Sequence, residues 1–279
     1  MSALRVLLWP PAAVWALVQL PQRKLLTYWR QFPRVWRPRP AHFFLRQSVG
    51  FYHARLIYSW PDRLSTPSWL DRCYLEGGHE LIKARQSDGG VVFASLHFGP
   101  FELLPYWLRS HGIVTTMIRG LAPPNSLKGL THYQYSLSPP AEVPVFLLAS
   151  DITPLPRFAH IRQILGPGRR LLVTVDASRG LQVDVPFQDR VFRMASGAIR
   201  LAAMADATLI PCLITETAPW KFTIHFGTSV PQTYLGQSPD LQAAGTHLLR
   251  EFSQVITRYP EQCRSRLLSA FSSAREHSL

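Results

Sequence analysis

The chain has 279 residues, of which 47% are hydrophobic, so it is long enough for one large domain with a buried core. Its charged fraction of 17% is below the roughly 25% usual for soluble proteins, which indicates that part of its surface does not face water. The net charge of +13 comes from 26 arginines and four lysines and favours an anionic partner, such as an anionic lipid, a nucleic acid or an acidic protein. The three cysteines are far apart, without metal or redox spacing, so no metal site is expected and the count fits a reducing compartment.

Residues 1–69 are expected to form a helical membrane-anchoring region. Residues 6–20 are apolar apart from Gln19, but the run is shorter than the roughly 20 residues of a perpendicular span and contains two prolines. It therefore predicts a short span or a helix lying in the membrane interface. The following stretch, RKLLTYWRQFPRVWRPRP, interleaves basic and aromatic side chains, as at the headgroup level of anionic membranes. The same mixture could bind nucleic acid, but the adjacent apolar run favours a membrane on its cytoplasmic face.

Residues 70–279 are expected to form one α/β domain, with a mixed, mostly parallel central sheet covered by helices. The predicted strands are continuous apolar runs, which is typical of a sheet buried on both faces. We place these strands at 91–96, 113–118, 143–148, 171–175, 208–214 and 222–226. We place helices at 40–59, 80–86, 100–111, 158–165, 196–205 and 241–259, and a long loop at 121–140.

The stretch VVFASLHFGPFELLPYW carries the first candidate for chemistry. His97 follows a buried-type strand, at the edge where open α/β sheets bind ligands. Gly99 and Pro100 are typical of a helix start, which would make Glu102 the third helical residue, with its side chain leaning back towards His97. A neutral imidazole is a suitable general base, and a carboxylate on its other nitrogen fixes its tautomer. With no serine or cysteine nucleophile in evidence, the base would activate a hydroxyl of the acceptor itself.

The spacing alone is weak support for this pair. With ten histidines and 17 acidic residues, about 0.6 such spacings arise by chance. Glu102 could equally satisfy backbone donors at a helix start, and His97 could simply pack at a strand end. The flanking sequence has to decide between these readings.

The flanking sequence resembles the bacterial lipid A late acyltransferases, the lauroyl and myristoyl transferases, within the glycerolipid acyltransferase superfamily that shares an HxxxxD/E motif. The resemblance rests on YLEGGHELIKARQSDGGVVFASLHFGPFELL, on the segment from GRRLLVTVDASRG to TLIPCLI, and on RYPEQC near the C-terminus. It implies a glycerolipid acyltransferase-like fold, with His97 as general base and Glu102 as its orienting partner. It also implies an acyl thioester donor without a further cofactor, and anchoring at the cytoplasmic face of the bacterial inner membrane.

The implied donor is an acyl carrier protein, which is acidic and would suit the positive chain, or acyl-CoA. Further substrate-binding candidates are Gly99, Arg119, Asp176 and Arg179. Arg119 ends a strand where the family has an arginine and could bind a phosphate, or be a surface residue. Asp176 matches the aspartate after LLVTV and could orient Arg179, approach His97 or cap the turn.

The chain departs from the family pattern at Ala177, at Phe187-Gln188-Asp189 and after the Pro-Glu-Gln segment. The resemblance therefore does not imply lipid A itself as the acceptor, which we expect to be a lipid or glycolipid, with a specialised metabolite equally open. The leading hypothesis is a membrane-associated acyltransferase. The alternatives are a catalytically inactive scaffold that binds lipid or membrane, and an esterase that uses the same site with water as acceptor.

Overall fold

The computed structural model describes, besides Pro10 and Val14, residues 29–30, 32–37, 39, 73–86, 89–120, 145–148, 168–177, 180–218 and 221–273. The predicted helices at 40–59 and 158–165, the loop at 121–140 and most of the predicted anchoring region lie outside these ranges. Within them, no helix combines the length and the apolar character that crossing a bilayer requires.

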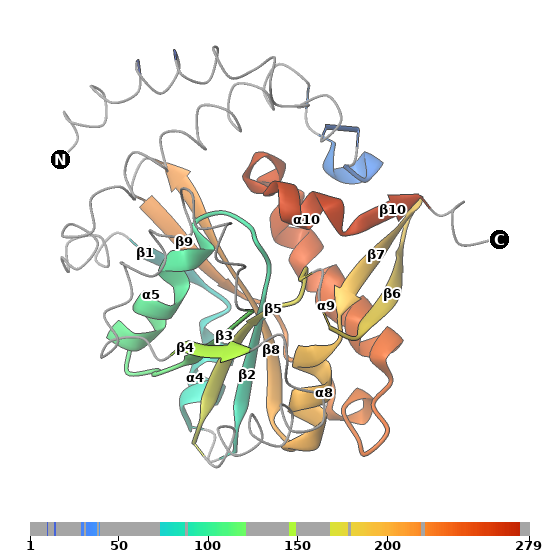
Figure 1. Ribbon diagram of the computed structural model, residues 1–279. Coiled ribbons are helices and arrows are strands. Elements are labelled where there is room, and N and C mark those ends of the chain that lie inside the picture. Colours follow the sequence, from blue (N-terminus) through green and yellow to red (C-terminus); the bar gives the residue numbers. More distant parts are fainter. Residues whose placement is uncertain are drawn as a thin grey trace.

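A seven-stranded sheet forms the centre of the molecule (Figure 1). Its strand order is β1-β9-β8-β2-β5-β3-β4. The strands are β1 (Cys73–Glu76), β2 (Val91–Ser95), β3 (Thr116–Gly120), β4 (Val145–Leu148), β5 (Arg170–Thr174), β8 (Thr208–Ala218) and β9 (Lys221–Phe226). All neighbouring pairs are parallel except β8 and β9, which are antiparallel. The expected mixed, mostly parallel sheet is confirmed, and β2 lies in its middle between β5 and β8.

Helices cover both faces of this sheet, as the continuous apolar strands predict. One face packs against α4 (Gly78–Gln86), the 3-10 helix η4 (Phe101–Leu103) and α5 (Leu104–Ser110), around a buried cluster that includes Phe93. The other face packs against α8 (Gly197–Met204) and α9 (Leu241–Ile256), around a second cluster that includes Leu96. Residues of β2 alternate between the two clusters, so the strand is held from both sides and its C-terminal end has a fixed position.

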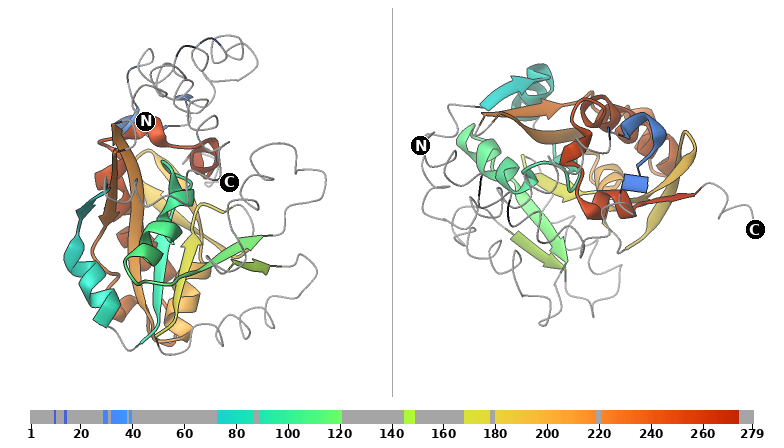
Figure 2. Two further views of the ribbon diagram at one scale, coloured as in Figure 1. Left: turned by 90° about the vertical axis from the view of Figure 1, so that its left-hand side faces the viewer. Right: turned by 90° about the horizontal axis from the view of Figure 1, so that it is seen from above.

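A second, three-stranded antiparallel sheet lies on the α9 side of the molecule, opposite α5 (Figures 1 and 2). It consists of β6 (Gln182–Phe187), β7 (Arg190–Ala195) and β10 (Phe271–Ser273), and the 3-10 helix η1 (Arg34–Trp36) packs on it through Trp36. The sequence analysis did not predict these strands. Many of their side chains are partly exposed and several are charged, so no continuous apolar run marks them.

The remaining described elements are short. They are the 3-10 helices η6 (Gln232–Tyr234) and η7 (Pro260–Gln262) and the helix α10 (Ser265–Ser269). The predicted helix at 100–111 is wrong at its start, because Gly99 belongs to a turn and Pro100 caps a 3-10 helix that continues into α5. Glu102 is therefore the second residue of a 3-10 helix, not the third of an α-helix.

Candidate functional site

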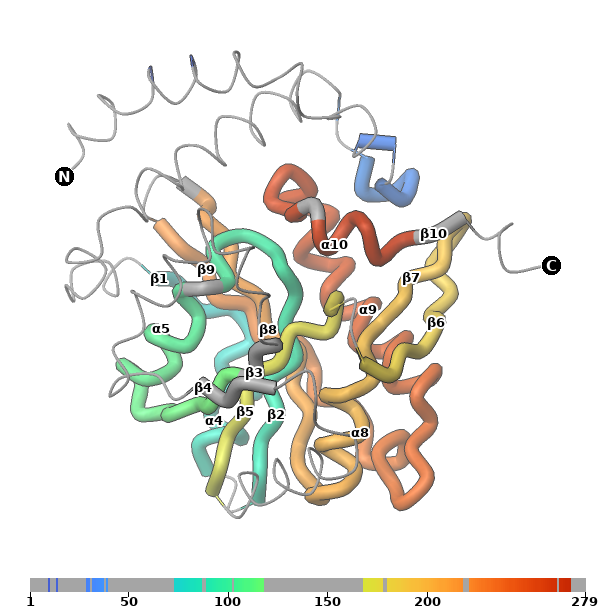
Figure 3. The backbone as a smooth tube through the Cα atoms, viewed as in Figure 1, coloured from blue at the N-terminus to red at the C-terminus, as the bar shows by residue number. Residues whose placement is uncertain are grey.

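His97 lies just beyond the C-terminal end of β2, two residues after Ser95. The chain then turns and enters η4 and α5, a path that the tube in Figure 3 follows. β2 is flanked by the parallel strands β5 and β8, so His97 lies where β2 and β5 end, whereas β8 continues past this point to Ala218. The side chain of His97 is 18% exposed, so its imidazole is mostly enclosed but reaches the surface.

Asp176 is the carboxylate that contacts His97. It follows β5 by two residues, and its side chain is completely buried. One carboxylate oxygen, Oδ1, lies 2.8 Å from Nδ1 of His97, and the other, Oδ2, accepts the backbone N–H of His97 at 3.0 Å. A carboxylate oxygen accepts rather than donates, so in the neutral imidazole Nδ1 carries the hydrogen and Nε2 keeps its lone pair. This is the tautomer that a general base at Nε2 requires.

The pairing of β2 with β5 explains why two residues 79 positions apart meet. Ser95 lies opposite Thr174 in the parallel register, and the N–H of Val175 donates to the carbonyl of Ser95 at 2.8 Å. The two strands therefore run side by side to their C-terminal ends, and Asp176 lies beside His97. Of the roles that the sequence left open for Asp176, its geometry selects the approach to His97.

Glu102, the predicted partner of His97, has a side chain outside the described part of the structure. Its backbone lies in η4, in the turn that follows His97. Because Asp176 occupies the Nδ1 position that the sequence analysis assigned to Glu102, a second carboxylate is not needed there to fix the tautomer. The role of Glu102 stays a prediction.

Gly99 lies in the turn between His97 and η4, with a φ of +53°. A Cβ atom at this position would lie 2.2 Å from the backbone oxygen of Ile214 in β8. Glycine is therefore required both for the left-handed backbone and for the close approach to β8. Its predicted role in binding substrate stays a prediction, whereas its role in shaping the turn is visible.

The Pro-Glu-Gln segment, which the sequence analysis noted only as a resemblance, lies directly against this turn. An antiparallel bridge joins Phe98 to Cys263, and the N–H of Arg264 donates to the carbonyl of His97 at 3.2 Å. The central carbon (Cζ) of the Arg264 guanidinium lies 4.7 Å from the centroid of the Phe101 ring. That ring packs edge-on against the imidazole of His97, with 4.7 Å between the two ring centroids. A cation is thus one aromatic ring away from the candidate base.

The structure leaves the other predicted site residues undescribed, in whole or in their side chains. Arg119 is in β3, where it lies opposite Leu147 of β4, but its side chain is outside the described part. Arg179 lies outside the described residues altogether. No group of three or more potential metal ligands occurs among the residues that the structure describes.

Neither buried cysteine is suited to act as a nucleophile. Burial raises the pKa of the Cys212 thiol and of the Cys263 thiol well above the usual range, so both remain protonated. Cys263 itself pairs with Phe98 of the His97 turn, yet it is 1% exposed. Among the described residues, the site therefore combines an imidazole with a carboxylate and has no activated thiol.

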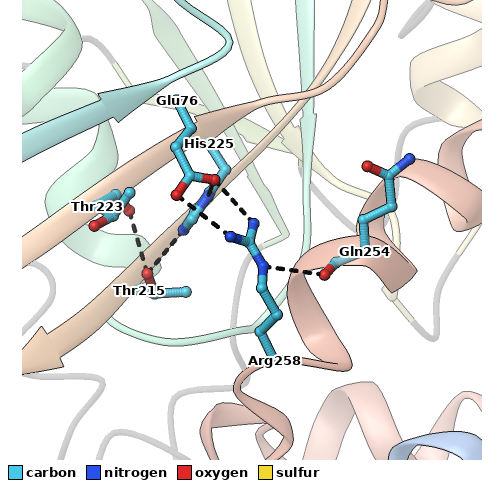
Figure 4. A network of polar contacts seen from close by, with 6 residues as sticks. All are labelled: Glu76, Thr215, Thr223, His225, Gln254 and Arg258. Carbon is cyan, nitrogen blue, oxygen red and sulfur yellow. Dashed lines mark hydrogen bonds and ion pairs between the residues drawn. The ribbon is translucent and has the colours of Figure 1, made fainter.

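A second polar network lies on the α9 face of the sheet (Figure 4). Nδ1 of His225 lies 2.9 Å from Oε2 of Glu76, its Nε2 lies 2.8 Å from the hydroxyl of Thr215, and Arg258 donates to both carboxylate oxygens of Glu76 at 2.9 and 3.3 Å. Burial lowers the pKa of His225, while Glu76 opposes that shift. The hydrogen bond from Arg258 lowers the pKa of the Glu76 carboxyl.

This network resembles a hydroxyl–imidazole–carboxylate relay, but its hydroxyl cannot meet a substrate. Thr215 is completely buried and His225 is 4% exposed. The network connects β1, β9 and β8 through the buried His225, and Glu76 extends it to Arg258, which follows α9, so we assign it a structural role. The sequence analysis did not single out these residues.

Comparison with known protein families gives one match. The model of the bacterial lipid A biosynthesis acyltransferase family covers residues 47–263, most of the chain, and includes His97, Asp176 and the Pro-Glu-Gln segment. This match confirms the resemblance drawn from the sequence. A search of curated proteins gives no significant match.

Proposed function

The chain belongs to the bacterial lipid A biosynthesis acyltransferase family, and we propose that it moves a fatty acyl group from a thioester donor to a hydroxyl of a lipid or glycolipid acceptor. The observation that carries this proposal is the His97–Asp176 pair at the C-terminal edge of the central sheet, with Nδ1 bonded and Nε2 left as the base. Family membership supplies acyl transfer as the class of reaction, and the pair supplies the proton acceptor that such a reaction requires.

In the proposed reaction, Nε2 of His97 takes the proton of the acceptor hydroxyl as its oxygen attacks the thioester carbonyl carbon. A new carbon–oxygen bond forms, and the carbonyl oxygen carries the negative charge in the tetrahedral intermediate. The intermediate collapses with loss of the carbon–sulfur bond, and the imidazolium returns its proton to the leaving thiolate. Asp176 keeps the imidazole in one tautomer and stabilises the imidazolium between these two steps.

The donor in this proposal is an acyl carrier protein or acyl-CoA. A net charge of +13 suits an acidic carrier protein, since opposite charges speed the encounter of two proteins. We further propose that residues 1–69 hold the chain at the cytoplasmic face of the bacterial inner membrane, which places the site near its lipid acceptor. The apolar run and the basic-aromatic stretch that follows it support this part of the proposal.

The experiment that tests the function is incubation of the full chain with acyl carrier protein or CoA carrying a labelled acyl group, together with a total bacterial lipid extract. Mass spectrometry of the products identifies the acceptor and the acyl chain together. We expect a labelled lipid ester from the wild type and none from His97→Ala. Labelled free fatty acid without a lipid ester would instead indicate an esterase.

A result without turnover from any donor would contradict the proposal and favour the inactive scaffold. Binding of the chain to vesicles of the same lipids, measured with the wild type and with His97→Ala, serves as the control. Because His97 has no proposed contact with the membrane, both proteins should bind the vesicles equally well. Loss of transfer in His97→Ala could then not be attributed to weaker membrane binding.

A further inference from the structure

Strand β8 continues past the point where β2 leaves it. The two strands pair from Val91 with Thr208 to Ala94 with Pro211, whereas β8 continues to Ala218. Beyond that point, on the edge of β8 that faces β2, the backbone of Glu216 is bonded by a side chain, while on the other edge Glu216 lies opposite Phe222 of β9. Its N–H donates to Oε1 of Gln262 at 3.0 Å, and its carbonyl accepts from Nε2 of Gln262 at 3.2 Å. The amide of Gln262 thus takes the place of a paired peptide group.

The backbone of Gln262 and that of Arg264 form hydrogen bonds with the turn that carries His97. The N–H of Gly99 donates to the carbonyl of Gln262 at 3.0 Å, and the N–H of Arg264 donates to the carbonyl of His97 at 3.2 Å. The side chain of Arg264 adds two bonds to the carbonyl of Gly99, from Nη2 at 2.8 Å and from Nε at 3.1 Å. Residues 262–264, which we call the clamp, therefore bond the backbone on both sides of Phe98.

The clamp leaves the turn little room to move. Phe98 and Cys263, which face each other in the bridge, are buried. A Cβ added to Gly99 would lie 2.2 Å from the backbone oxygen of Ile214 and 3.0 Å from Oε1 of Gln262, so the turn lies between β8 and the clamp. Asp176 holds the imidazole from a third side.

We propose that Gln262 and Arg264 are positioning residues for His97. This proposal rests on the proposed function of His97 as the base. Asp176 fixes the tautomer of the ring, and the clamp fixes the backbone from which the ring projects. A base must reach the reacting proton to within hydrogen-bond distance, and a displacement of about 1 Å lowers the rate by about 100-fold. The residues that fix its backbone therefore act on the rate without contacting the substrate.

The test compares Gln262→Ala with Gln232→Ala in the full chain. Gln232 also donates its side-chain amide to one partner, Oδ1 of Asp206 at 2.6 Å, but it belongs to η6, and that partner is not in the His97 turn. We expect Gln262→Ala to lower kcat by about 100-fold and to leave KM for the thioester within about threefold. Gln232→Ala should leave both constants unchanged.

Conservative variants and a spectroscopic signal separate positioning from folding. Arg264→Lys keeps one donor for the carbonyl of Gly99, so it should retain more activity than Arg264→Ala at matched thermal stability. In protein labelled with 15N-histidine, the Nδ1–H of His97, identified by its loss in His97→Gln, should exchange with water faster in Gln262→Ala than in the wild type or in Gln232→Ala.

Measuring both kcat and the exchange of the His97 Nδ1–H also distinguishes failure of this proposal from failure of the proposed function. An inactive wild type would overturn the function, and the exchange of the Nδ1–H would still decide whether the clamp positions His97. Wild-type kcat in Gln262→Ala, or an unchanged exchange rate of the Nδ1–H in that variant, would overturn the clamp as a positioning device.

Discussion

Replacement of Gly99 by alanine tests how closely the turn after β2 is fitted to β8. The new Cβ would lie 2.2 Å from the backbone oxygen of Ile214, where the closest real contacts are 3.0 Å, so one backbone must move by about 0.8 Å. Gly99 is two residues from His97, and a misplacement of about 1 Å lowers catalytic rates by about 100-fold. We therefore expect Gly99→Ala to lower kcat for acyl transfer by about 100-fold, measured with a labelled thioester donor.

Gly112→Ala is the matched control. Gly112 has a φ of +76°, comparable to the +53° of Gly99, but in the described part of the structure nothing lies within 4 Å of its added Cβ. Both variants carry the strain of a left-handed alanine, about 1–2 kcal/mol, and Gly99→Ala adds roughly 1–3 kcal/mol from the overlap with β8. Thermal denaturation gives these losses, and Gly112→Ala should keep its activity. If Gly99→Ala retained activity within threefold of the wild type, the fitted turn would not control the position of His97.

Two further predictions concern stability. Burial lowers the pKa of His225 in the folded chain below its usual value near 6.5. As the pH falls below 6.5, the unfolded chain therefore binds a proton that the folded chain does not. The contribution of His225 to the free energy of unfolding is present above pH 6.5 and is lost as the pH drops below it. The free energy of unfolding should change by at most about 1.4 kcal/mol per pH unit from this cause. Denaturant unfolding between pH 7.5 and 5.5 should show this slope in the wild type and not in His225→Gln. Equal slopes for both proteins would refute the prediction. The hydroxyl of Ser95 is buried without a hydrogen-bond partner among the described residues, so Ser95→Ala should leave the melting temperature unchanged or raise it, and a clear decrease would contradict this.

The sequence predicted the framework of the site well, because the framework depends on local patterns. Continuous apolar runs such as Val91–Leu96 marked the buried strands, and the position of His97 after β2 followed from the strand end. The long apolar run in β8 likewise placed a core strand, although its extension to Ala218 was not predicted. That extension matters, because it supplies the edge against which the turn and Gln262 pack.

The partners of His97 could not be selected from the sequence for a physical reason. Asp176 is 79 residues away and meets His97 only because β2 and β5 are neighbours, and strand order does not follow from local periodicity. Glu102 was the nearer carboxylate in sequence, which favoured it. Gln262 and Arg264 lie still farther along the chain. The sequence marked this region only through the Pro-Glu-Gln resemblance, which does not indicate which residues the segment contacts.

The central claim is that Asp176 sets the tautomer of His97 for acyl transfer, and Asp176→Asn tests it most directly. Asparagine keeps an oxygen for the backbone N–H of His97, but its amide favours the tautomer that has no lone pair on Nε2. Measured beside Glu102→Gln with a labelled thioester donor, Asp176→Asn should lose kcat by roughly 10³- to 10⁴-fold. Near wild-type transfer by Asp176→Asn, together with loss of transfer in Glu102→Gln, would contradict it.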